Sequence, residues 1–388
     1  MEISACVKYV GVNDHQVDLF EGQYKVPNGM SYNSYVILDE KIAIMDTVDG
    51  FFTEEWLNNV EQVLDGKMPD YLIIQHMEPD HSASIPAFLK KYPKSTVVST
   101  AKGFQFMEQF FPEFFAGQGL PAEQRIVAAN DGVLELGQHS LHFVYAPMVH
   151  WPEVMMTYEA TEKILFAADG FGKFGALDVE EEWTDEARRY YIGIVGKYGP
   201  QVQAVLKKAA GLDIQTICSL HGPVLKENLG FYLEKYDMWS SYQPEESGVV
   251  IAYASVYGNT RNAAEYLADV LQEKGQKTVL YDLARCDKAK AVADAFRYDR
   301  LVLAGITYNG DLFPCMRSFI EGLTERNYQN RKVAIIENGT WAPMAGKLIL
   351  GMFEKSKNLT FTETTVSIKS AMNAQNKGEI GKLAEELC

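Results

Sequence analysis

Short apolar runs alternate with turns and helical patterns along the first two thirds of the chain. Residues 35–38 and 42–46 predict a β-hairpin across the polar residues 39–41. Further apolar runs predict strands at 71–74, 96–99, 125–127, 142–145, 163–167 and 216–219, and helical periodicity predicts helices at 52–64, 84–92, 102–111, 182–195 and 201–210. Because strands and helices are interspersed, we expect α/β or α+β layers here.

A more regular alternation follows residue 248. The segment 240–248 is polar, contains a proline and lacks periodicity, so it predicts a linker between two domains, 1–245 and 248–388. Apolar strands are expected at 249–254, 278–281, 301–305, 333–336 and 365–368, with a helix at 262–274. Such strands, alternating with helices, are typical of a parallel sheet covered on both faces.

Ionisable residues concentrate after strand 71–74, where Pro79 is expected to break any helix that follows. The candidate metal ligands are His76, Glu78, Asp80, His81, His150, Asp169 and His221. Each falls beyond a predicted strand, so we expect all seven to converge on one edge of a sheet. Imidazole and carboxylate suit zinc or iron, and seven ligands are too many for one tetrahedral ion. They fit two metals with an open position on each.

A polar loop without metal is the alternative. The chain has seven histidines, and a lone histidine is usually a hydrogen-bonded surface or core residue, as we expect for His15, His139 and His142. A loop crowded with ionisable groups is costly to fold unless a cation compensates their charge. Metal binding is therefore favoured at 76–81.

A phosphate-binding loop is predicted after strand 249–254. Residues 255–260 read S-V-Y-G-N-T and enter a helix, and hydroxyls, a glycine and backbone N–H groups at a helix start bind anions. The loop matches neither G-x-x-x-x-G-K-[ST] nor G-x-G-x-x-G, which disfavours a nucleoside triphosphate or a dinucleotide and favours FMN. Similar residues also cap many helices without binding a ligand.

Two further loops strengthen the flavin prediction. Loops 307–311 and 338–341 follow the third and fourth strands, and in a doubly wound sheet both emerge beside loop 255–260. Tyr308 and Trp341 are expected to flank a planar ring, the alternative being ordinary exposed aromatics. The predicted FMN contacts are Ser255, Val256, Tyr257, Gly258, Asn259, Thr260, Thr307, Tyr308, Asn309, Gly310, Asn338, Gly339, Thr340 and Trp341.

Composition and charge narrow the function classes. The chain is 47% hydrophobic, as in globular proteins, and its net charge of −16 disfavours nucleic acid or an anionic membrane as a partner. We see no secretory signal and no apolar run long enough for a membrane span. The cysteines are scattered without a C-x-x-C pair, so we expect no disulfide, iron–sulfur cluster or rubredoxin-like site, and a cytoplasmic location.

Over nearly its whole length the chain resembles the flavodiiron proteins, also called A-type flavoproteins. The motifs behind the resemblance are H-x-E-x-D-H at 76–81, H-W-P at 150–152, A-D-G-F-G at 168–172, S-x-H-G-P at 219–223, L-F-E-G at 19–22 and S-Y-N-S-Y at 31–35. Zinc hydrolases of the same fold usually have histidine at the Glu78 position, and the added carboxylate favours iron.

The resemblance implies an α/β chain in which an N-terminal metallo-β-lactamase-like αββα domain with two irons precedes a flavodoxin-like doubly wound parallel sheet with FMN. It implies that one iron is bound by His76, Glu78 and His150, the other by Asp80, His81 and His221, and that Asp169 bridges them. No catalytic residue is expected beyond these ligands.

The family's activity is the reduction of dioxygen to water, of nitric oxide to nitrous oxide, or both. By the resemblance, electrons pass from an external donor, a rubredoxin-like protein or a reduced deazaflavin, through FMN to the irons. Members usually pair head to tail, so we expect a homodimer or a dimer of dimers.

Two departures from the family pattern bear on the site. Asn28 stands where many members have a histidine near the substrate pocket, which leaves the preferred gas open. The third flavin loop reads E-N-G-T-W at 337–341, where the family commonly has G-S-Y-G-W. Tyr190 and Tyr191 are candidates to line the pocket, although aromatics on a helix more often belong to the core.

Two other functions stay open. One is a hydrolase with two zinc ions and a bound hydroxide, to which the flavodoxin-like domain is an accessory. The other is a flavin electron carrier or redox sensor whose metal domain is only a scaffold. Glu78 and the flavin loops count against the hydrolase, and the complete ligand set counts against the carrier.

Overall fold

The computed structural model describes residues 3–116 and 120–388, which form two compact units. The first unit extends to Tyr191 and resumes over Pro200–Asp237, and the second comprises Ile192–Gly199 and Met238–Cys388. The domain limits expected from the sequence, 1–245 and 248–388, stay a prediction, because the two units exchange a short segment of chain around residues 192–199.

Two sheets pack face to face in the first unit. One has the strand order β1-β6-β7-β8-β9-β10 and the other the order β11-β12-β13-β14-β15. The strands of the first sheet are β1 (Val7–Tyr9), β6 (Tyr35–Ile37), β7 (Ala43–Met45), β8 (Tyr71–Ile73), β9 (Thr96–Ser99) and β10 (Arg125–Val127). Those of the second are β11 (Val133–Glu135), β12 (Ser140–Tyr145), β13 (Met155–Glu159), β14 (Ile164–Phe166) and β15 (Thr216–Cys218). The unit also contains two small two-stranded sheets. In one, β2 (Val12–Asp14) pairs with β5 (Met30–Tyr32), and in the other β3 (Leu19–Phe20) pairs with β4 (Tyr24–Lys25).

The core of this unit lies between its sheets. Met45 and Ile73 of the first sheet and Phe143, Met155 and Phe166 of the second belong to one buried apolar cluster. Every residue of β7, β8 and β14 is buried, because helices cover the outer faces of the sheets. Burial on both faces explains why these strands are continuous apolar runs in the sequence.

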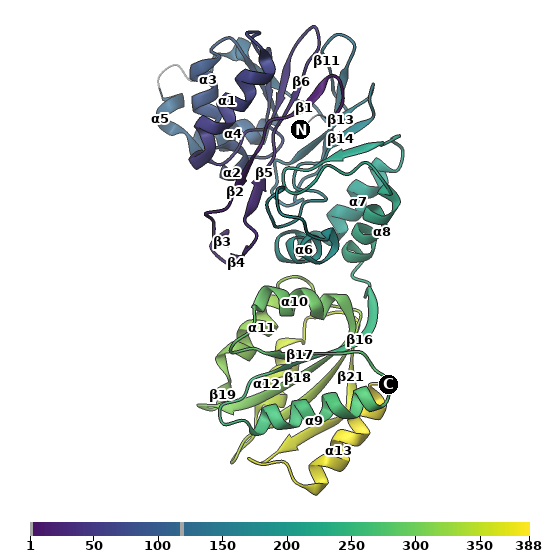
Figure 1. The fold of residues 1–388 in the computed structure, drawn as a ribbon. Coiled ribbons are helices and arrows are strands. Elements are labelled where there is room, and N and C mark those ends of the chain that lie inside the picture. The colour runs from purple at the N-terminus through teal and green to yellow at the C-terminus, as the bar shows by residue number, and fades with distance from the viewer. Residues whose placement is uncertain (1–2, 117–119) are drawn as a thin grey trace. The chain divides into compact units, whose positions relative to one another are not determined.

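Helices form the outer layers of the sandwich, as Figure 1 shows. Those beside the first sheet are α1 (Thr53–Leu64), α2 (Pro79–Ser82), α3 (Ile85–Lys91), α4 (Ala101–Phe110) and α5 (Pro112–Phe115). Those beside the second are α6 (Trp183–Tyr190), α7 (Gly199–Ala209) and α8 (Leu229–Ser240). In α1, Trp56, Val60 and Leu64 are buried at intervals of four residues, which presents one apolar face to the sheet. The predicted αββα architecture is confirmed.

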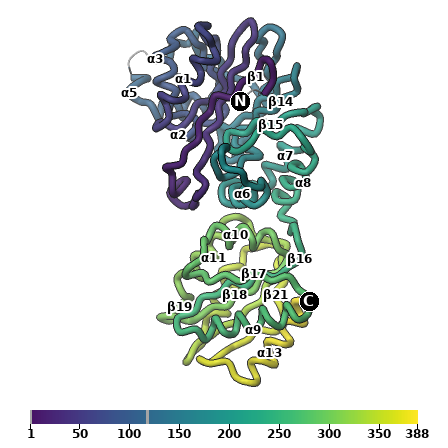
Figure 2. Tube along the Cα trace, viewed as in Figure 1, coloured from purple at the N-terminus to yellow at the C-terminus, as the bar shows by residue number. Residues whose placement is uncertain are grey.

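The second unit is a doubly wound parallel sheet, confirming the predicted fold (Figure 2). Its strands are β16 (Glu246–Tyr253), β17 (Thr278–Asp282), β18 (Tyr298–Tyr308), β19 (Asp311–Leu312), β20 (Arg331–Asn338) and β21 (Leu359–Ile368). The order is β17-β16-β18-β20-β21, with β19 antiparallel to the end of β18. From β16 the chain passes first to β17 and then to β18 on the other side, so the topological switch point lies beside β16.

Helices cover both faces of this sheet. They are α9 (Asn259–Glu273), α10 (Lys288–Arg297), α11 (Pro314–Thr324), α12 (Ala345–Met352) and α13 (Ala374–Glu386). Leu267 and Leu271 of α9 and Ile380 and Leu383 of α13 share one core with the strands, while α10, α11 and α12 lie on the opposite face (Figure 1). Within residues 3–116 and 120–388, no helix is both long and apolar enough to cross a membrane.

Three local predictions were wrong. Pro79 does not end a helix; it is the first residue of α2, where its fixed φ is suitable and its missing N–H costs nothing. The expected helix 182–195 ends as an α-helix at Tyr190 and continues as a π-helical turn over Tyr191–Val195. The expected linker 240–248 is shorter, since α8 includes Ser240 and β16 begins at Glu246.

Candidate metal centre and flavin site

The seven candidate metal ligands come together at one end of the first unit. Four follow β8 of the first sheet, and three follow β12, β14 and β15 of the second sheet. They are His76, Glu78, Asp80 and His81 in the first group and His150, Asp169 and His221 in the second. The ligands therefore lie where the ends of two sheets meet. The expectation was that they would lie at the edge of a single sheet.

One half of the cluster contains His76, Glu78, His150 and Asp169, with one possible ligand atom from each within 4.8 Å of the others. Glu78 Oε2 lies 3.2 Å from Nε2 of His76 and 3.0 Å from Nε2 of His150. Asp169 Oδ2 lies 3.5 Å and 3.1 Å from the same two nitrogens. Two imidazoles and two carboxylates thus face a single point.

The other half contains Asp80, His81 and His221. Asp80 Oδ2 lies 3.3 Å from Nε2 of His81 and 3.3 Å from Nε2 of His221. The second oxygen of Asp169, Oδ1, lies 3.2 Å from His81 Nε2 and 3.8 Å from His221 Nε2. Asp169 therefore directs one carboxylate oxygen into each half of the cluster.

Burial and mutual charge shape the protonation of this cluster. Burial alone would lower the pKa of His76, but the surrounding carboxylates, Asp169 foremost, raise it well above its usual value. Burial would also lower the pKa of His150, but the hydrogen bonds that its imidazole makes to the carboxylates of Asp169 and Glu78 outweigh burial and raise this pKa to about 9. Burial would raise the pKa of Asp169, yet the imidazoles of His76 and His81 hold it well below its usual value. Metal binding would displace protons from these imidazoles.

The donor set fits two metal ions. Within the described residues, both carboxylate oxygens of Asp80, Oδ1 of Asp169 and Nδ1 of His81 are buried without a hydrogen-bond partner. A buried polar atom left without a partner costs about 1–3 kcal/mol, and more when it is charged. Cations between the imidazoles and the carboxylates would remove this cost for the carboxylate oxygens. Three carboxylates together also offset three of the four positive charges of two divalent ions.

Two of the imidazoles are oriented by a hydrogen-bond partner at Nδ1, the ring nitrogen that faces away from the cluster. Glu153 is buried, and its Oε1 lies 2.8 Å from Nδ1 of His76 and accepts the Met77 N–H at 2.9 Å. The Ser31 carbonyl lies 2.7 Å from Nδ1 of His221. Each contact leaves the Nε2 lone pair free for a metal. Sequence reasoning did not single out Glu153, although its place directly after the H-W-P segment is a usable signal.

Asp46 braces the strand end from which His76 projects. It follows β7, and its carboxylate accepts the backbone N–H of Gln75 at 2.7 Å and the side-chain N–H of Gln75 at 2.9 Å. Burial raises the pKa of Asp46 to about 6 even though these hydrogen bonds oppose the shift. This pair fixes the chain at the entry to the 76–81 segment.

Asn28 and Tyr190 take up different places around the cluster. The Asn28 amide donates to Glu181 Oε1 at 2.9 Å, and Glu181 also pairs with the buried ammonium of Lys173 at 2.6 Å. Asn28 is thus held by a charged partner. Tyr190 is buried, and its ring centroid lies 5.5 Å from that of His221. Of the two tyrosines singled out from the sequence, Tyr190 directly flanks the cluster.

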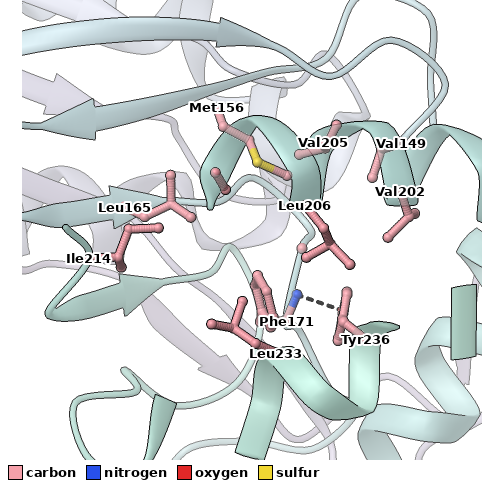
Figure 3. A pocket seen from close by; sticks show the side chains of 12 residues that line it. Val149, Met156, Leu165, Phe171, Val202, Val205, Leu206, Ile214, Leu233 and Tyr236 are labelled. Atoms are coloured by element: carbon pink, nitrogen blue, oxygen red, sulfur yellow. Dashed lines mark hydrogen bonds between the residues drawn. The ribbon is translucent and has the colours of Figure 1, made fainter. Parts of the chain in front are cut away.

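An apolar cavity of about 20 Å³ lies beside two segments of the cluster. Its lining comes from β13, β14, α7, α8 and the residues next to His150 and Asp169 (Figure 3). The lining residues are Val149, Met156, Leu165, Gly170, Phe171, Val202, Val205, Leu206, Ala209, Ile214, Leu233 and Tyr236. No polar atom of these residues faces the cavity, and the Tyr236 hydroxyl accepts the Phe171 N–H at 2.6 Å. Such a space suits a small apolar molecule better than water.

The predicted phosphate loop lies between β16 and α9 at the switch point of the second unit. Gly258 caps α9 with φ 91°, a left-handed conformation that favours glycine. Its N–H donates to Ser255 Oγ at 3.1 Å, which closes the loop. A glycine offers no capping side chain, so the N–H groups of the first helical turn suit an anion.

The other two predicted flavin loops follow β18 and β20, the next strands in the sheet. Asn309 and Gly310, with φ 52° and 73°, form the two-residue turn between β18 and β19. Thr307 accepts the Met344 N–H at 2.8 Å, so its hydroxyl also holds the start of α12. The Asn338 side chain exchanges two hydrogen bonds with the backbone of Ser370.

Three exposed aromatic side chains mark this edge of the sheet. Tyr257 is 92% exposed, Trp341 82% and Tyr308 47%. Each lies in a different one of the three loops, at the carboxyl ends of β16, β20 and β18. An anion-binding helix start beside exposed aromatics fits a phosphate joined to a planar ring. The individual FMN contacts stay a prediction.

Comparisons with known proteins agree with both units. The family model described as ODP family beta lactamase matches residues 30–222, and the model described as flavodoxin domain matches residues 250–357. The anaerobic nitric oxide reductase flavorubredoxin of Vibrio vulnificus is 27% identical over 96% of this chain and 75% of its own length. The flavodiiron protein of Giardia intestinalis superposes with a TM-score of 0.91 at 25% identity, covering 100% of this chain and 96% of that one.

The chain belongs to the flavodiiron proteins. The resemblance inferred from the sequence motifs is therefore confirmed. A further solved structure, rubredoxin oxygen:oxidoreductase of Desulfovibrio gigas, shares the fold with a TM-score of 0.92 at 24% identity, over 100% of this chain and 97% of that one. For this flavodiiron protein, membership supports an oxidoreductase role in the nitric oxide and dioxygen reductase family. It implies FMN and a non-haem di-iron site.

Replacing Asp46 by Asn should stabilise the metal-free protein at neutral pH but not in acid. The pKa of Asp46 is raised from 3.8 to about 6, so the folded state loses stability as the pH rises from about 4 to about 6. The introduced amide would keep the Gln75 contacts after a flip of the Gln75 amide, whose Oε1 is buried without a partner among the described residues. Above this range, the unfolding free energy of Asp46→Asn should exceed that of the parent by about 3 kcal/mol. Urea unfolding of both proteins across this pH range measures it; an identical pH dependence would refute the argument.

Replacing Glu153 by Gln should weaken metal binding without unfolding the protein. The amide keeps the shape of Glu153 but loses the negative charge that faces His76 Nδ1. Affinity for the metal on the His76 side should fall about 10- to 100-fold. Competition with a chelator measures the affinity, and Glu108→Gln, at an exposed carboxylate of the same unit outside the cluster, serves as the control. Equal affinities in all three proteins would contradict this role for Glu153.

Replacing Gly258 by Val should remove FMN and leave the metals in place. Valine is strained at φ 91°, and its branching at Cβ adds to that backbone strain. Gly275→Val is the matched control, because Gly275 has φ 76° at the other end of α9. Flavin absorbance and metal content after purification report the outcome. Normal flavin in Gly258→Val, or equal losses in both variants, would argue against the phosphate loop.

Proposed function

We propose that this flavodiiron protein reduces dioxygen to water, nitric oxide to nitrous oxide, or both, at two irons held by the seven-residue cluster. The observation that supports this most is the position of Asp169, whose two carboxylate oxygens each face a different pair of imidazoles. A carboxylate shared in this way suits two metals placed close together. When bound, two irons would supply the electrons that reduce the gas.

We assign the residues to the two ions as the sequence resemblance implies. One iron would be held by His76, Glu78 and His150, the other by Asp80, His81 and His221, and both by Asp169. Glu78 gives the cluster a third carboxylate in place of a further imidazole, which makes the site harder and favours iron over zinc. This is the reason for preferring a reductase to a zinc hydrolase.

The remaining residues keep the cluster rigid and largely dry. Glu153 and the Ser31 carbonyl orient two imidazoles, so little reorganisation accompanies electron transfer. The ring centroids of Phe20 and Tyr190 lie 5.4 Å and 5.5 Å from that of His221 and shield that side of the cluster. Water is thereby limited near the position where a gas molecule would bind.

The apolar cavity supports a gaseous substrate. Dioxygen and nitric oxide are small and nearly apolar, so they partition into apolar spaces that exclude water. Val149 and Gly170 line this cavity and are the immediate chain neighbours of His150 and Asp169. A gas molecule held there would be close to two of the proposed ligands. A hydrolase acting on a polar substrate has no use for such a space.

The second unit would bind FMN through the loops after β16, β18 and β20. Its backbone N–H groups at the start of α9 would hold the phosphate, and Tyr308 and Trp341 would flank the ring. When bound, FMN passes electrons to the irons. From the family resemblance we infer a rubredoxin-like protein or a reduced deazaflavin as the external donor, and a head-to-tail homodimer or dimer of dimers. The scattered cysteines favour a cytoplasmic location.

The decisive test compares the parent protein with Asp169→Ala. Both are reduced fully without air and mixed with dioxygen or, separately, with nitric oxide, while flavin reoxidation is followed. We expect fast reoxidation of the parent by at least one gas and a loss of roughly a hundredfold or more in Asp169→Ala, with FMN retained. Asp213→Ala is the control, since Asp213 is an exposed carboxylate of the same unit.

Two outcomes would contradict the proposal. One is undiminished turnover in Asp169→Ala, which would exclude a bridging role for that carboxylate. The other is about two zinc ions and no iron per chain in natively purified protein, which would favour a hydrolase. Comparing the two gases in the parent also resolves which of them is the preferred substrate.

A further inference from the structure

A second cluster of metal-binding side chains lies in the first unit, away from the seven-residue cluster. Ligand atoms of Cys6, His139 and Glu162 all lie within 4.8 Å of one another. His139 comes just before β12 and Glu162 just before β14, whereas His150 and Asp169 come after the same two strands. The two clusters therefore lie at opposite ends of the sandwich.

His139 is oriented as a metal ligand would be. Its side chain is 5% exposed, and its Nδ1 lies 2.8 Å from Asp39 Oδ2, which also accepts the His139 backbone N–H at 2.7 Å. Burial would raise the pKa of Asp39, but these hydrogen bonds lower it, so the carboxylate stays ionised. An ionised acceptor at Nδ1 places the proton there and the lone pair on Nε2. This nitrogen faces Glu162.

The distance from His139 to Glu162 suits two ligands of one ion. Nε2 of His139 lies 3.8 Å from Oε1 of Glu162, which is too long for a hydrogen bond. Two ligands on a tetrahedral ion with bonds of about 2.1 Å are separated by about 3.4 Å. A small contraction around a cation would bring the pair to that separation.

Around Cys6, the carboxylates of Glu162 and Asp39 outweigh the one nearby ammonium, that of Lys8. Glu162 Oε2 is buried with no hydrogen-bond partner among residues 3–116 and 120–388. Burial first, and then the carboxylates of Glu162 and Asp39, raise the pKa of the Cys6 thiol. A divalent cation would satisfy the free carboxylate oxygen and allow the thiol to ionise. Three independent features, a free oxygen, an oriented imidazole and a nearby thiol, thus point to the same ligand.

The framework around the cluster is already in place. The Cys6 carbonyl accepts the Leu38 N–H at 2.9 Å, which ties the N-terminal segment to β6. At Gly137, with φ 133°, an added Cβ would lie 2.8 Å from Glu40 and 2.9 Å from Asp39 Oδ1, so the two turns touch through a glycine. The Glu162 N–H donates to Glu159 Oε2 at 2.6 Å. Little rearrangement would be needed on binding.

We propose that Cys6, His139 and Glu162 bind one zinc ion, with water as the fourth ligand. Thiolate, imidazole and carboxylate are the three side-chain ligands that zinc uses, and the described part of the chain adds no fourth ligand to this group, which leaves a position for solvent. The Cys6 thiol would release its proton to water on binding. The ion would link the N-terminal segment to the β11–β12 and β13–β14 turns. Sequence reasoning assigned His139 no such role, since it was expected to be an ordinary surface or core residue.

Sulfur distinguishes this site from the proposed iron site, whose seven ligands include no cysteine. Full-length protein carrying its iron is given one equivalent of zinc, and X-ray absorption is recorded at the zinc edge. We expect a sulfur neighbour at about 2.3 Å in the parent. The same signal should persist in Cys286→Ser, a half-buried cysteine of the other unit, and vanish in Cys6→Ser. Only nitrogen and oxygen neighbours in the parent, or sulfur retained in Cys6→Ser, would overturn the proposal.

Zinc affinity gives a second measure that does not depend on Cys6. His139→Ala should bind zinc at least about tenfold more weakly than the parent in competition with a chelator. His142→Ala is the control, because His142 lies in β12 close to His139 but outside the cluster. Iron content is measured in each protein to show that the other cluster is intact. Equal zinc affinity in the parent and in folded His139→Ala would contradict the proposal.

Discussion

The electrostatic balance among seven clustered ionisable side chains, six of them buried and Glu78 partly exposed, is the constraint on which the first unit depends. Four imidazoles and three carboxylates are brought together where water cannot screen them. The pKa values of His76 and His150 are raised and that of Asp169 is lowered, mainly by their mutual attraction, which keeps these three groups paired. Several oxygens still lack hydrogen bonds among the described residues. Asp169 is central to this balance because its two oxygens connect both halves.

The sandwich explains how so many charged groups can be held in one place. Because the strands are buried on both faces, polar residues can lie only at the strand ends. The ends of the two sheets lie next to each other. One end gathers the seven proposed iron ligands, and the other gathers Cys6, His139 and Glu162. The second unit follows the same rule, because its flavin loops all leave the carboxyl ends of parallel strands. The rigid apolar strands thus position reactive side chains that lie in the loops between the strands and helices.

Much of this organisation could be predicted from the sequence. The apolar runs located the central strands, and the spacing of residues 76–81 and 255–260 identified both candidate sites before any contact was known. Features set by tertiary contacts could not be read in this way. Glu153 acts through a hydrogen bond to His76 that spans 77 positions in the chain. Pro79 starts α2 because the preceding segment leaves the sheet there, and periodicity alone does not reveal this.

The central claim is that two irons lie on either side of the Asp169 carboxylate. Anomalous diffraction at the iron edge, from crystals of natively purified protein, tests it most directly. The account predicts two iron peaks, one among His76, Glu78 and His150 and the other among Asp80, His81 and His221, with Asp169 between them. A single peak, or two peaks that appear only at the zinc edge, would contradict it.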